Sequence, residues 1–389
     1  MSSIFLISIS VVLFAALSLA FVLVRRNMHI WLWDYLFGGW RKRTTTRPTH
    51  IMFCFVDHFE PHHGQVDDNR ADERMQLWLK RYPELARKYK DADGNYLKHT
   101  WFYPYDELLE RELEQLGQLC AQGLGEVEFH LHHKDDTSDT LRKKLLDGLK
   151  VFNKYGIAIT EDEKITYGFI HGNWALDNSI IRNGQNYCGV NDELTVLQET
   201  GCYADFTFPA YLEPSQPHLV NTIFYAKDDP QRPKSHHRGR PATVGIKPED
   251  GEFLLIQGPM VLNWKRRRMG IMPNVEDGNI HQGNLFHPSK VDLWVKAGIH
   301  IHGKDDWIFI KIFTHGAPEK NHEAVLGKDA ERLFDYLTQK YNDGENFILH
   351  FVTAREMYNI IKAAEDGKDG DPNLFRDYLI KPYKNLRGE

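Results

Sequence analysis

The sequence predicts an α/β protein built on a parallel β-sheet or (β/α) barrel, preceded by one membrane-spanning helix. Two observations lead to this prediction. From Thr49 onward, short apolar runs alternate with amphipathic helical segments, and such alternation with short connections is typical of parallel βα units. Ahead of that region, residues 4–24 contain no charged residue and are long enough to cross a bilayer as a helix.

The elements of the body follow from their local patterns. The predicted strands are apolar runs that end in polar residues, namely 51–56, 125–133, 164–174, 307–317 and 346–352. The predicted helices repeat apolar residues at helical spacing, namely 106–123, 138–156, 191–201, 330–341 and 353–367. Residues 211–300 lack this periodicity, are rich in Pro, Gly, Arg and His, and are interpreted as an insertion.

The N-terminal region divides the chain into three parts. Residues 1–26 are predicted to be a transmembrane anchor, 27–48 a juxtamembrane linker and 49–389 the main domain. A cleaved signal peptide is the alternative, but no Lys or Arg precedes the apolar run. The basic clusters follow the run, so the positive-inside rule predicts a single-pass protein of the inner (cytoplasmic) membrane. Its main domain would lie on the cytoplasmic side, with membrane lipid as a partner.

Composition narrows the choice of partners and chemistry. A net charge of −6 gives no reason to expect nucleic acid as a partner. The chain has 20 His residues, and surplus imidazole favours a metal or proton-transfer site. Its four cysteines show no CxxC spacing and are predicted to be reduced, buried thiols. A disulfide between Cys188 and Cys202 remains an open alternative.

Polar residues lie at or just after the carboxyl ends of four of the predicted strands. Carboxyl ends of parallel strands meet at one edge of a sheet, so these side chains are expected to form one site. They are Asp57 and His58, then His130, His132, His133 and Asp136, then His171, Asn173 and Trp174, and finally His315. Imidazole and carboxylate together suit a divalent metal such as Zn²⁺. The alternative is an exposed charged turn that caps the helix 138–156.

At these residues the chain resembles the NodB-homology polysaccharide deacetylases, a family of carbohydrate esterases. The matching stretches are FVDHFEP, EFHLHHKDD, FIHGNWALD and IKIFTHGA. The resemblance implies a distorted seven-stranded (β/α) barrel. It implies Asp57 as general base and His315 as general acid. It also implies a metal held by His58, His132 and Asp136, although which of the three neighbouring His residues binds stays open.

The chain departs from the family pattern in two ways. His58 replaces an Asp and Asp136 replaces a His, so the ligand types are exchanged but their number is kept. The Arg of the third motif is absent, and His171 and Asn173 lie there instead, with Trp174, as predicted substrate-binding residues.

The expected function is a membrane-anchored, zinc-dependent deacetylase. It would remove N-acetyl groups from a glycan or lipid-linked sugar in polysaccharide biosynthesis. Two alternatives stay open. One is a glycoside hydrolase on the same barrel, for which Asp57 and Glu60 would be the paired carboxylates. The other is a non-catalytic scaffold of a polysaccharide assembly complex, favoured by the altered motifs.

Overall fold

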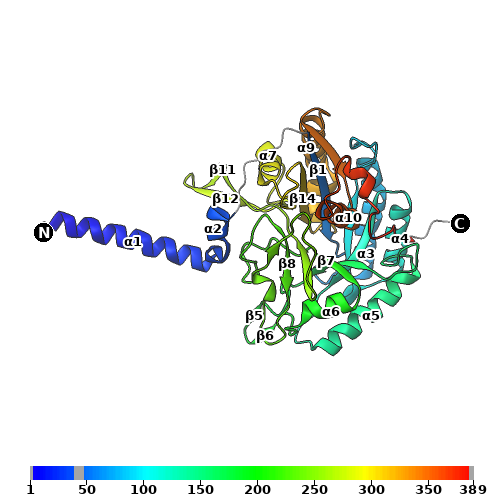
Figure 1. The fold of residues 1–389 in the computed structure, drawn as a ribbon, viewed down its shortest axis with the longest axis horizontal. Coiled ribbons are helices and arrows are strands. Elements are labelled where there is room, and N and C mark those ends of the chain that lie inside the picture. Colours follow the sequence, from blue (N-terminus) through cyan, green and yellow to red (C-terminus); the bar gives the residue numbers. More distant parts are fainter. Residues whose placement is uncertain (1–2, 39–47, 385–389) are drawn as a thin grey trace.

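The computed structural model describes residues 3–38 and 48–384 and shows a mixed α/β fold around one large sheet (Figure 1). This sheet has eleven strands, in the order β13-β14-β1-β2-β3-β4-β7-β10-β8-β9, with β15 paired to β1 off this path. Its strands are β1 (Thr49–His58), β2 (His99–Pro104), β3 (Gly125–Leu131), β4 (Tyr167–His171), β7 (Cys202–Asp205), β8 (Ile223–Lys227), β9 (Arg240–Pro241), β10 (Glu252–Ile256), β13 (Asn279–Ile280), β14 (Trp307–Thr314) and β15 (Phe347–Phe351).

Ten α-helices are found among the described residues. They are α1 (Ser3–Arg25), α2 (Met28–Phe37), α3 (Asp68–Ala86), α4 (Glu110–Ala121), α5 (Ser138–Lys154), α6 (Glu193–Glu199), α7 (Pro288–Ala297), α8 (His322–Leu326), α9 (Lys328–Tyr341) and α10 (Ala354–Glu365). Two small antiparallel pairs lie outside the main sheet: β5 (Ile181–Arg182) with β6 (Gln185–Asn186), and β11 (Val261–Arg268) with β12 (Met272–Glu276).

Strand β1 is the centre of the sheet because it pairs with three neighbours. It runs parallel to β14 along most of its length, to β15 at its first residues, and to β2 only from Val56 to His58. The three neighbours are all parallel to β1, so the carboxyl ends of β14, β1 and β2 lie at the same edge. The residues that directly follow β1 therefore lie between the ends of β14 and β2.

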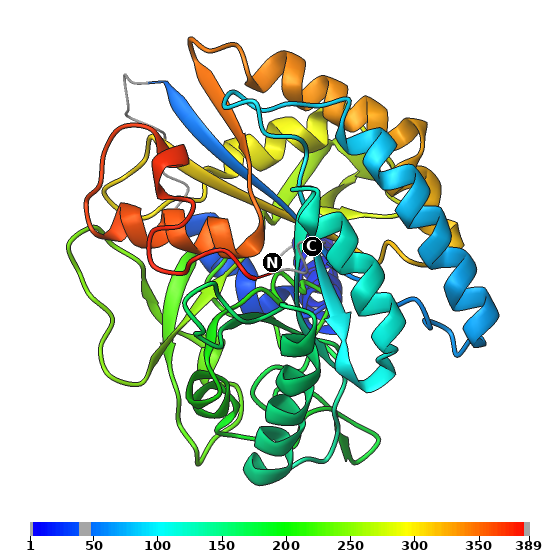
Figure 2. The same cartoon turned by 90° about the vertical axis from the view of Figure 1, so that its right-hand side faces the viewer.

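Alternation along the strands divides the core between two faces. On one face, Phe53 and Phe55 belong to a buried cluster that includes apolar residues of α3, α4, α5 and α9. These four helices lie in a row outside the sheet, from orange through blue to green in Figure 2. On the other face, Met52, Cys54 and Val56 pack in a cluster with α10. Two-sided burial explains why β1 is apolar without a period-two pattern.

The predicted seven-stranded parallel barrel is wrong. The large sheet is mostly parallel, but β8 pairs antiparallel with both β10 and β9. These strands come from 211–300, which therefore contributes to the main sheet and is not only a covering insertion. The strand path ends at β13 and β9, and no ladder between described strands joins these two ends.

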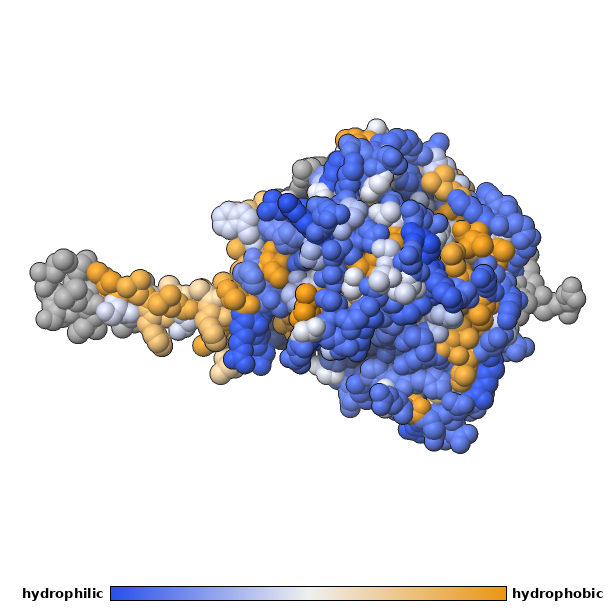
Figure 3. Space-filling view, turned by 90° about the horizontal axis from the view of Figure 1, so that it is seen from below, coloured by the Kyte–Doolittle hydropathy of each residue, from blue (hydrophilic) through white to orange (hydrophobic). Residues whose placement is uncertain are grey.

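The predicted transmembrane anchor is also wrong. Helix α1 extends away from the body (Figures 1 and 3). Its exposed apolar side chains include Phe14, Leu17 and Phe21. Within residues 3–38 and 48–384, however, no helix combines the length and the apolar character needed to cross a bilayer. This finding overturns the assignment of residues 1–26 as a membrane anchor. It also overturns the single-pass inner-membrane location with a cytoplasmic main domain.

The first part of the predicted linker 27–48 is a helix that packs on the body. Trp31 of α2 is completely buried, the Asp34 carboxylate accepts a 3.0 Å hydrogen bond from the Val220 amide, and His218 Nδ1 lies 2.9 Å from the Ile30 carbonyl. Residues 39–47 of that linker lie outside the described residues.

A buried ion pair joins α10 to β3 and yields a stability prediction. Arg355 Nη2 lies 2.8 Å from Glu126 Oε1, and both side chains are nearly inaccessible to solvent. Arg355→Met should lower the free energy of unfolding by about 3–5 kcal/mol in urea titrations, because it leaves Glu126 buried and unpaired. Lys143→Met, which removes an exposed ion pair with Asp147, is the control and should change stability little. Equal effects of the two substitutions would contradict the prediction.

Candidate metal centre

A buried carboxylate, Glu60, lies just beyond the end of β1 and is surrounded by imidazoles. Its Oε1 atom lies 3.2 Å from His130 Nε2 and 3.4 Å from His132 Nε2. Its Oε2 atom lies 2.7 Å from His63 Nδ1. His130 is the penultimate residue of β3 and His132 follows that strand, so the ends of two parallel strands bring these groups together.

The far nitrogens of His130 and His132 are held by acceptors. His130 Nδ1 lies 2.9 Å from the Ile170 carbonyl oxygen, and His132 Nδ1 lies 3.1 Å from Asp106 Oδ2. Because both partners only accept, each Nδ1 carries a proton. Each Nε2 faces the Glu60 carboxylate and donates to it when no metal is bound. This arrangement is typical of metal-binding histidines, whose second nitrogen donates to a carboxylate or carbonyl.

Two further imidazoles extend the same centre. His58 and His315 stack with ring centroids 4.6 Å apart, and the His58 ring meets that of His130 edge-on at 5.0 Å. Ligand atoms of His58, Glu60 and His315 lie within 4.8 Å of one another, as do those of Glu60, His130 and His132. Glu60 is common to both groups. These residues could hold a metal ion.

The electrostatics of the centre also suit a cation. Burial lowers the pKa of His58, and His315 and His130 lower it further. Burial raises the pKa of Glu60, but hydrogen bonds with His130, His132 and His63 outweigh it and hold that pKa well below its usual value. Burial likewise opposes protonation of His132, yet Asp106 and Glu60 raise its pKa to about 10. A divalent ion bound by His132 would displace this proton.

Asp57, the base predicted from the sequence, makes hydrogen bonds to residues next to the centre. Its Oδ1 atom accepts a 2.7 Å hydrogen bond from the Gly316 amide, and its Oδ2 atom lies 3.1 Å from His99 Nε2. A Cβ atom at residue 316 would overlap the Asp57 carboxylate, so this close approach requires glycine. Asp57 therefore fixes the turn that carries His315.

The other sequence-predicted residues separate into two places. Trp174 stacks on His58, with ring centroids 4.8 Å apart, and lies at the centre. Asp136 lies elsewhere, 3.2 Å from His133 Nδ1 and 2.7 Å from Lys144 Nζ. His171 packs against His133, and the Asn173 side chain donates to the His133 and Tyr187 carbonyls. The predicted ligand set of His58, His132 and Asp136 is thus not brought together.

Sequence reasoning gave Glu60 and His130 smaller roles and missed Asp106. Glu60 entered only as a possible carboxylate for a different reaction, because it lies beyond the strand end rather than on it. His130 remained one of three open choices. Asp106 is the middle residue of a short 3₁₀ helix, Tyr105–Glu107, after β2, and no local pattern linked it to His132.

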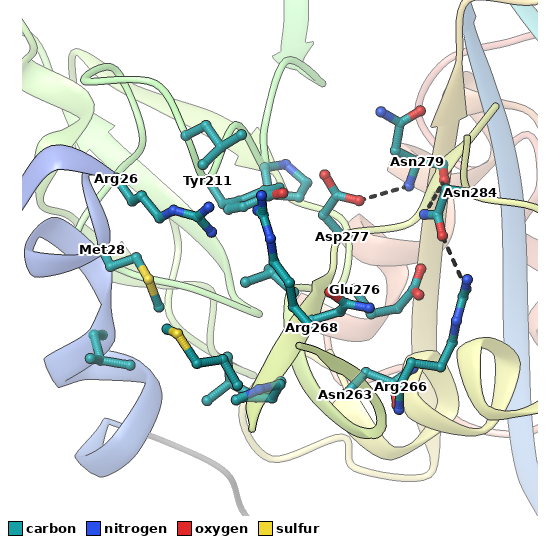
Figure 4. Close-up of a pocket in the computed structure, with 18 of the residues that line it drawn as sticks. Arg26, Met28, Tyr211, Asn263, Arg266, Arg268, Glu276, Asp277, Asn279 and Asn284 are labelled. Atoms are coloured by element: carbon teal, nitrogen blue, oxygen red, sulfur yellow. Dashed lines mark hydrogen bonds between the residues drawn. The ribbon is translucent and has the colours of Figure 1, made fainter. Parts of the chain in front are cut away.

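A large pocket, shown in Figure 4, lies next to the centre. Its volume is about 1360 Å³, and its lining includes Trp174, which stacks on His58, and Phe313, whose ring centroid lies 6.2 Å from that of His58. Its outer walls come from α1, α2 and the β11–β12 hairpin, with many apolar side chains. Figure 4 shows Arg26 and Arg268 directed into this space from opposite walls, near Tyr211.

Comparison with known proteins does not show a family for this chain. No family model matches it. A stretch of 178 residues is 29% identical to DNA topoisomerase 2 of Invertebrate iridescent virus 6, covering 42% of this chain. The chain spans only 14% of the length of that relative.

The contact between Asp106 and His132 yields a second prediction. Asp106→Asn should weaken metal binding at this centre by roughly 10–100-fold, because the amide orients the His132 ring less firmly and makes it less basic. Chelator competition on the full chain measures this affinity. The ion to measure is the one that the His132→Ala variant no longer binds. Asp139→Asn, at a side chain that is 98% exposed, is the control and should leave the affinity unchanged. Unaltered affinity in Asp106→Asn would show that His132 is not a ligand.

Proposed function

We propose that this protein is a metal-dependent hydrolase that removes N-acetyl groups from a glycan or a lipid-linked sugar. The observation that carries the proposal is the gathering of imidazoles around Glu60, next to a large pocket whose lining residue Trp174 stacks on His58. The resemblance of FVDHFEP and IKIFTHGA to deacetylase motifs supports the same reaction class. Polysaccharide biosynthesis remains the proposed setting.

Glu60, His130 and His132 are the proposed ligands of the metal, which we propose to be zinc. When bound, zinc would supply Lewis acidity toward the acetamide carbonyl and lower the pKa of a water. The donor set fits such an ion, because zinc accepts imidazole nitrogen and carboxylate oxygen together. His58 lies beside these ligands with a buried Nδ1 atom that has no hydrogen-bond partner among the described residues.

His315 is the proposed proton carrier. Burial lowers its pKa, so the ring begins neutral at pH 7 and can take a proton from the attacking water. It then returns that proton to the departing amine. Asp57 acts by positioning, because both of its oxygens are engaged by Gly316 and His99. This engagement also counts against paired-carboxylate cleavage of a glycosidic bond by Asp57 and Glu60.

Acetate release from N-acetylated oligosaccharides tests the proposed reaction. Chelation and Glu60→Gln should abolish release, and His315→Ala should reduce kcat by roughly 10²–10⁴-fold, because the proton carrier is lost. His350→Gln is the control. That buried side chain lies 2.7 Å from Asp93 and 2.9 Å from His50, and it should affect stability rather than turnover per folded molecule. A metal-loaded, folded chain that releases no acetate from any such substrate would refute the proposal.

The pocket supports a substrate that joins a sugar, a phosphate and an apolar chain. Arg26 and Arg268 would bind the phosphate, and the apolar residues of α1 and α2 would contact the chain. Arg268→Ala should therefore raise KM by roughly tenfold for a phosphate-linked lipid sugar, the equivalent of one lost charged hydrogen bond. KM for the free oligosaccharide should not change. Arg232→Ala, at an exposed arginine outside the pocket, is the control. An equal rise in KM for both substrates would exclude phosphate recognition by Arg268.

A further inference from the structure

A second group of potential ligands lies apart from the centre around Glu60, which is called the first centre below. It consists of His133 after β3, His171 at the end of β4, Cys188 in the following loop, and Glu193 at the start of α6. All four side chains are buried, and one ligand atom from each lies within 4.8 Å of the others. The proposed deacetylation does not use any of them.

We propose that these four side chains bind a structural zinc ion. His133 Nε2 lies 2.9 Å from Glu193 Oε1, and His171 Nε2 lies 3.8 Å from the same oxygen. Cys188 Sγ lies 3.3 Å from Glu193 Oε2. Tetrahedral bonds of about 2.0–2.3 Å around zinc separate neighbouring ligand atoms by roughly these distances. Small side-chain shifts around a central ion would complete the arrangement.

An unpartnered nitrogen points independently to a ligand at this place. His171 is completely buried, and its Nε2 atom has no hydrogen-bond partner among the described residues. Its Nδ1 atom accepts a 3.2 Å contact from the Asn173 amide, so Nε2 carries the proton of the neutral ring. A buried donor without an acceptor is unfavourable, because its hydrogen bond to water is lost and not replaced. A metal bound to Nε2 removes that cost.

Binding has one local consequence at Asn173. With zinc on Nε2, the ring proton of His171 moves to Nδ1. Nδ1 then no longer accepts the 3.2 Å hydrogen bond from the Asn173 backbone amide. Asn173 is partly exposed, so its amide can donate to water instead. The Asn173 side chain keeps its own hydrogen bonds to the loop carbonyls.

The surroundings orient two of the other ligands, His133 and Cys188. His133 Nδ1 lies 3.2 Å from Asp136 Oδ2, which itself pairs with Lys144 at 2.7 Å. The Val190 amide donates a 3.3 Å hydrogen bond to Cys188 Sγ, as expected around a thiolate. Outer contacts of this kind hold the ligands of zinc sites in place.

The donor set selects both the metal and its role. A thiolate with two imidazoles disfavours magnesium and calcium, which prefer oxygen. Four buried protein ligands leave no open position, and closed tetrahedral sites are structural rather than catalytic. The ion would tie the ends of β3 and β4 to the loop 172–192. That loop carries Trp174, which stacks on His58 in the first centre.

Cobalt substitution tests this site without measuring activity. The full chain is expressed in cobalt-supplemented medium, and its near-ultraviolet absorption is recorded. The Cys188 thiolate should give a thiolate-to-cobalt charge-transfer band, whereas the first centre contains no cysteine and should give none. A folded, cobalt-loaded wild-type chain without this band would overturn the proposal, whatever the fate of any variant.

Variants assign the band to Cys188. A chain in which Cys54, Cys120 and Cys202 are replaced by Ser, leaving Cys188 as its only cysteine, should keep the band. Cys188→Ser should lose it, together with about one of two zinc ions per chain by elemental analysis, while His132→Ala should keep it. Survival of the band in Cys188→Ser would also overturn the proposal. The outcome is independent of acetate release, so the two proposals can fail separately.

Discussion

The hydrogen bonds between the buried carboxylate of Glu60 and the histidines at the end of β3 are the constraint on which the candidate centre depends. A buried carboxylate is costly unless it is paired, so this contact fixes how the end of β1 approaches the end of β3. His315 joins the centre through β14, which runs parallel to β1 in register up to Thr314. The hydrogen bond from Gly316 to Asp57 then holds the turn that follows.

Strand β3 shows how the same fold holds ionisable side chains inside its core. Its odd-numbered residues, such as Val127 and Phe129, pack in the apolar cluster beneath α5. Its even-numbered residues are polar, and each makes a hydrogen bond or ion pair with a specific side chain. Glu126 pairs with Arg355, the Glu128 carboxylate accepts from Tyr203 and Tyr383, and His130 pairs with Glu60. This polar row ends in the first centre.

Side chains continue to alternate between the two sides of the chain past the end of β3, and this alternation separates two groups of ligands. His132 faces Glu60, whereas the next residue, His133, faces Glu193. Because neighbouring residues in extended backbone point to opposite sides, three histidines in four positions serve two places rather than one. Asp136 accordingly contacts His133 and is not part of the first centre.

The sequence by itself determined the local elements and the residue types of the site. Periodicity located β1, β3, β4, β14 and β15 and the helix that becomes α10, which the Thr353–Glu356 capping box begins, because these features depend on neighbours in the chain. The four cysteines are free, as expected. Only the tertiary structure decided the antiparallel strands from 211–300 and the pairing of Glu60 with His130, 70 positions away. Such pairings depend on which strand ends become neighbours, and no local pattern in the chain encodes that choice.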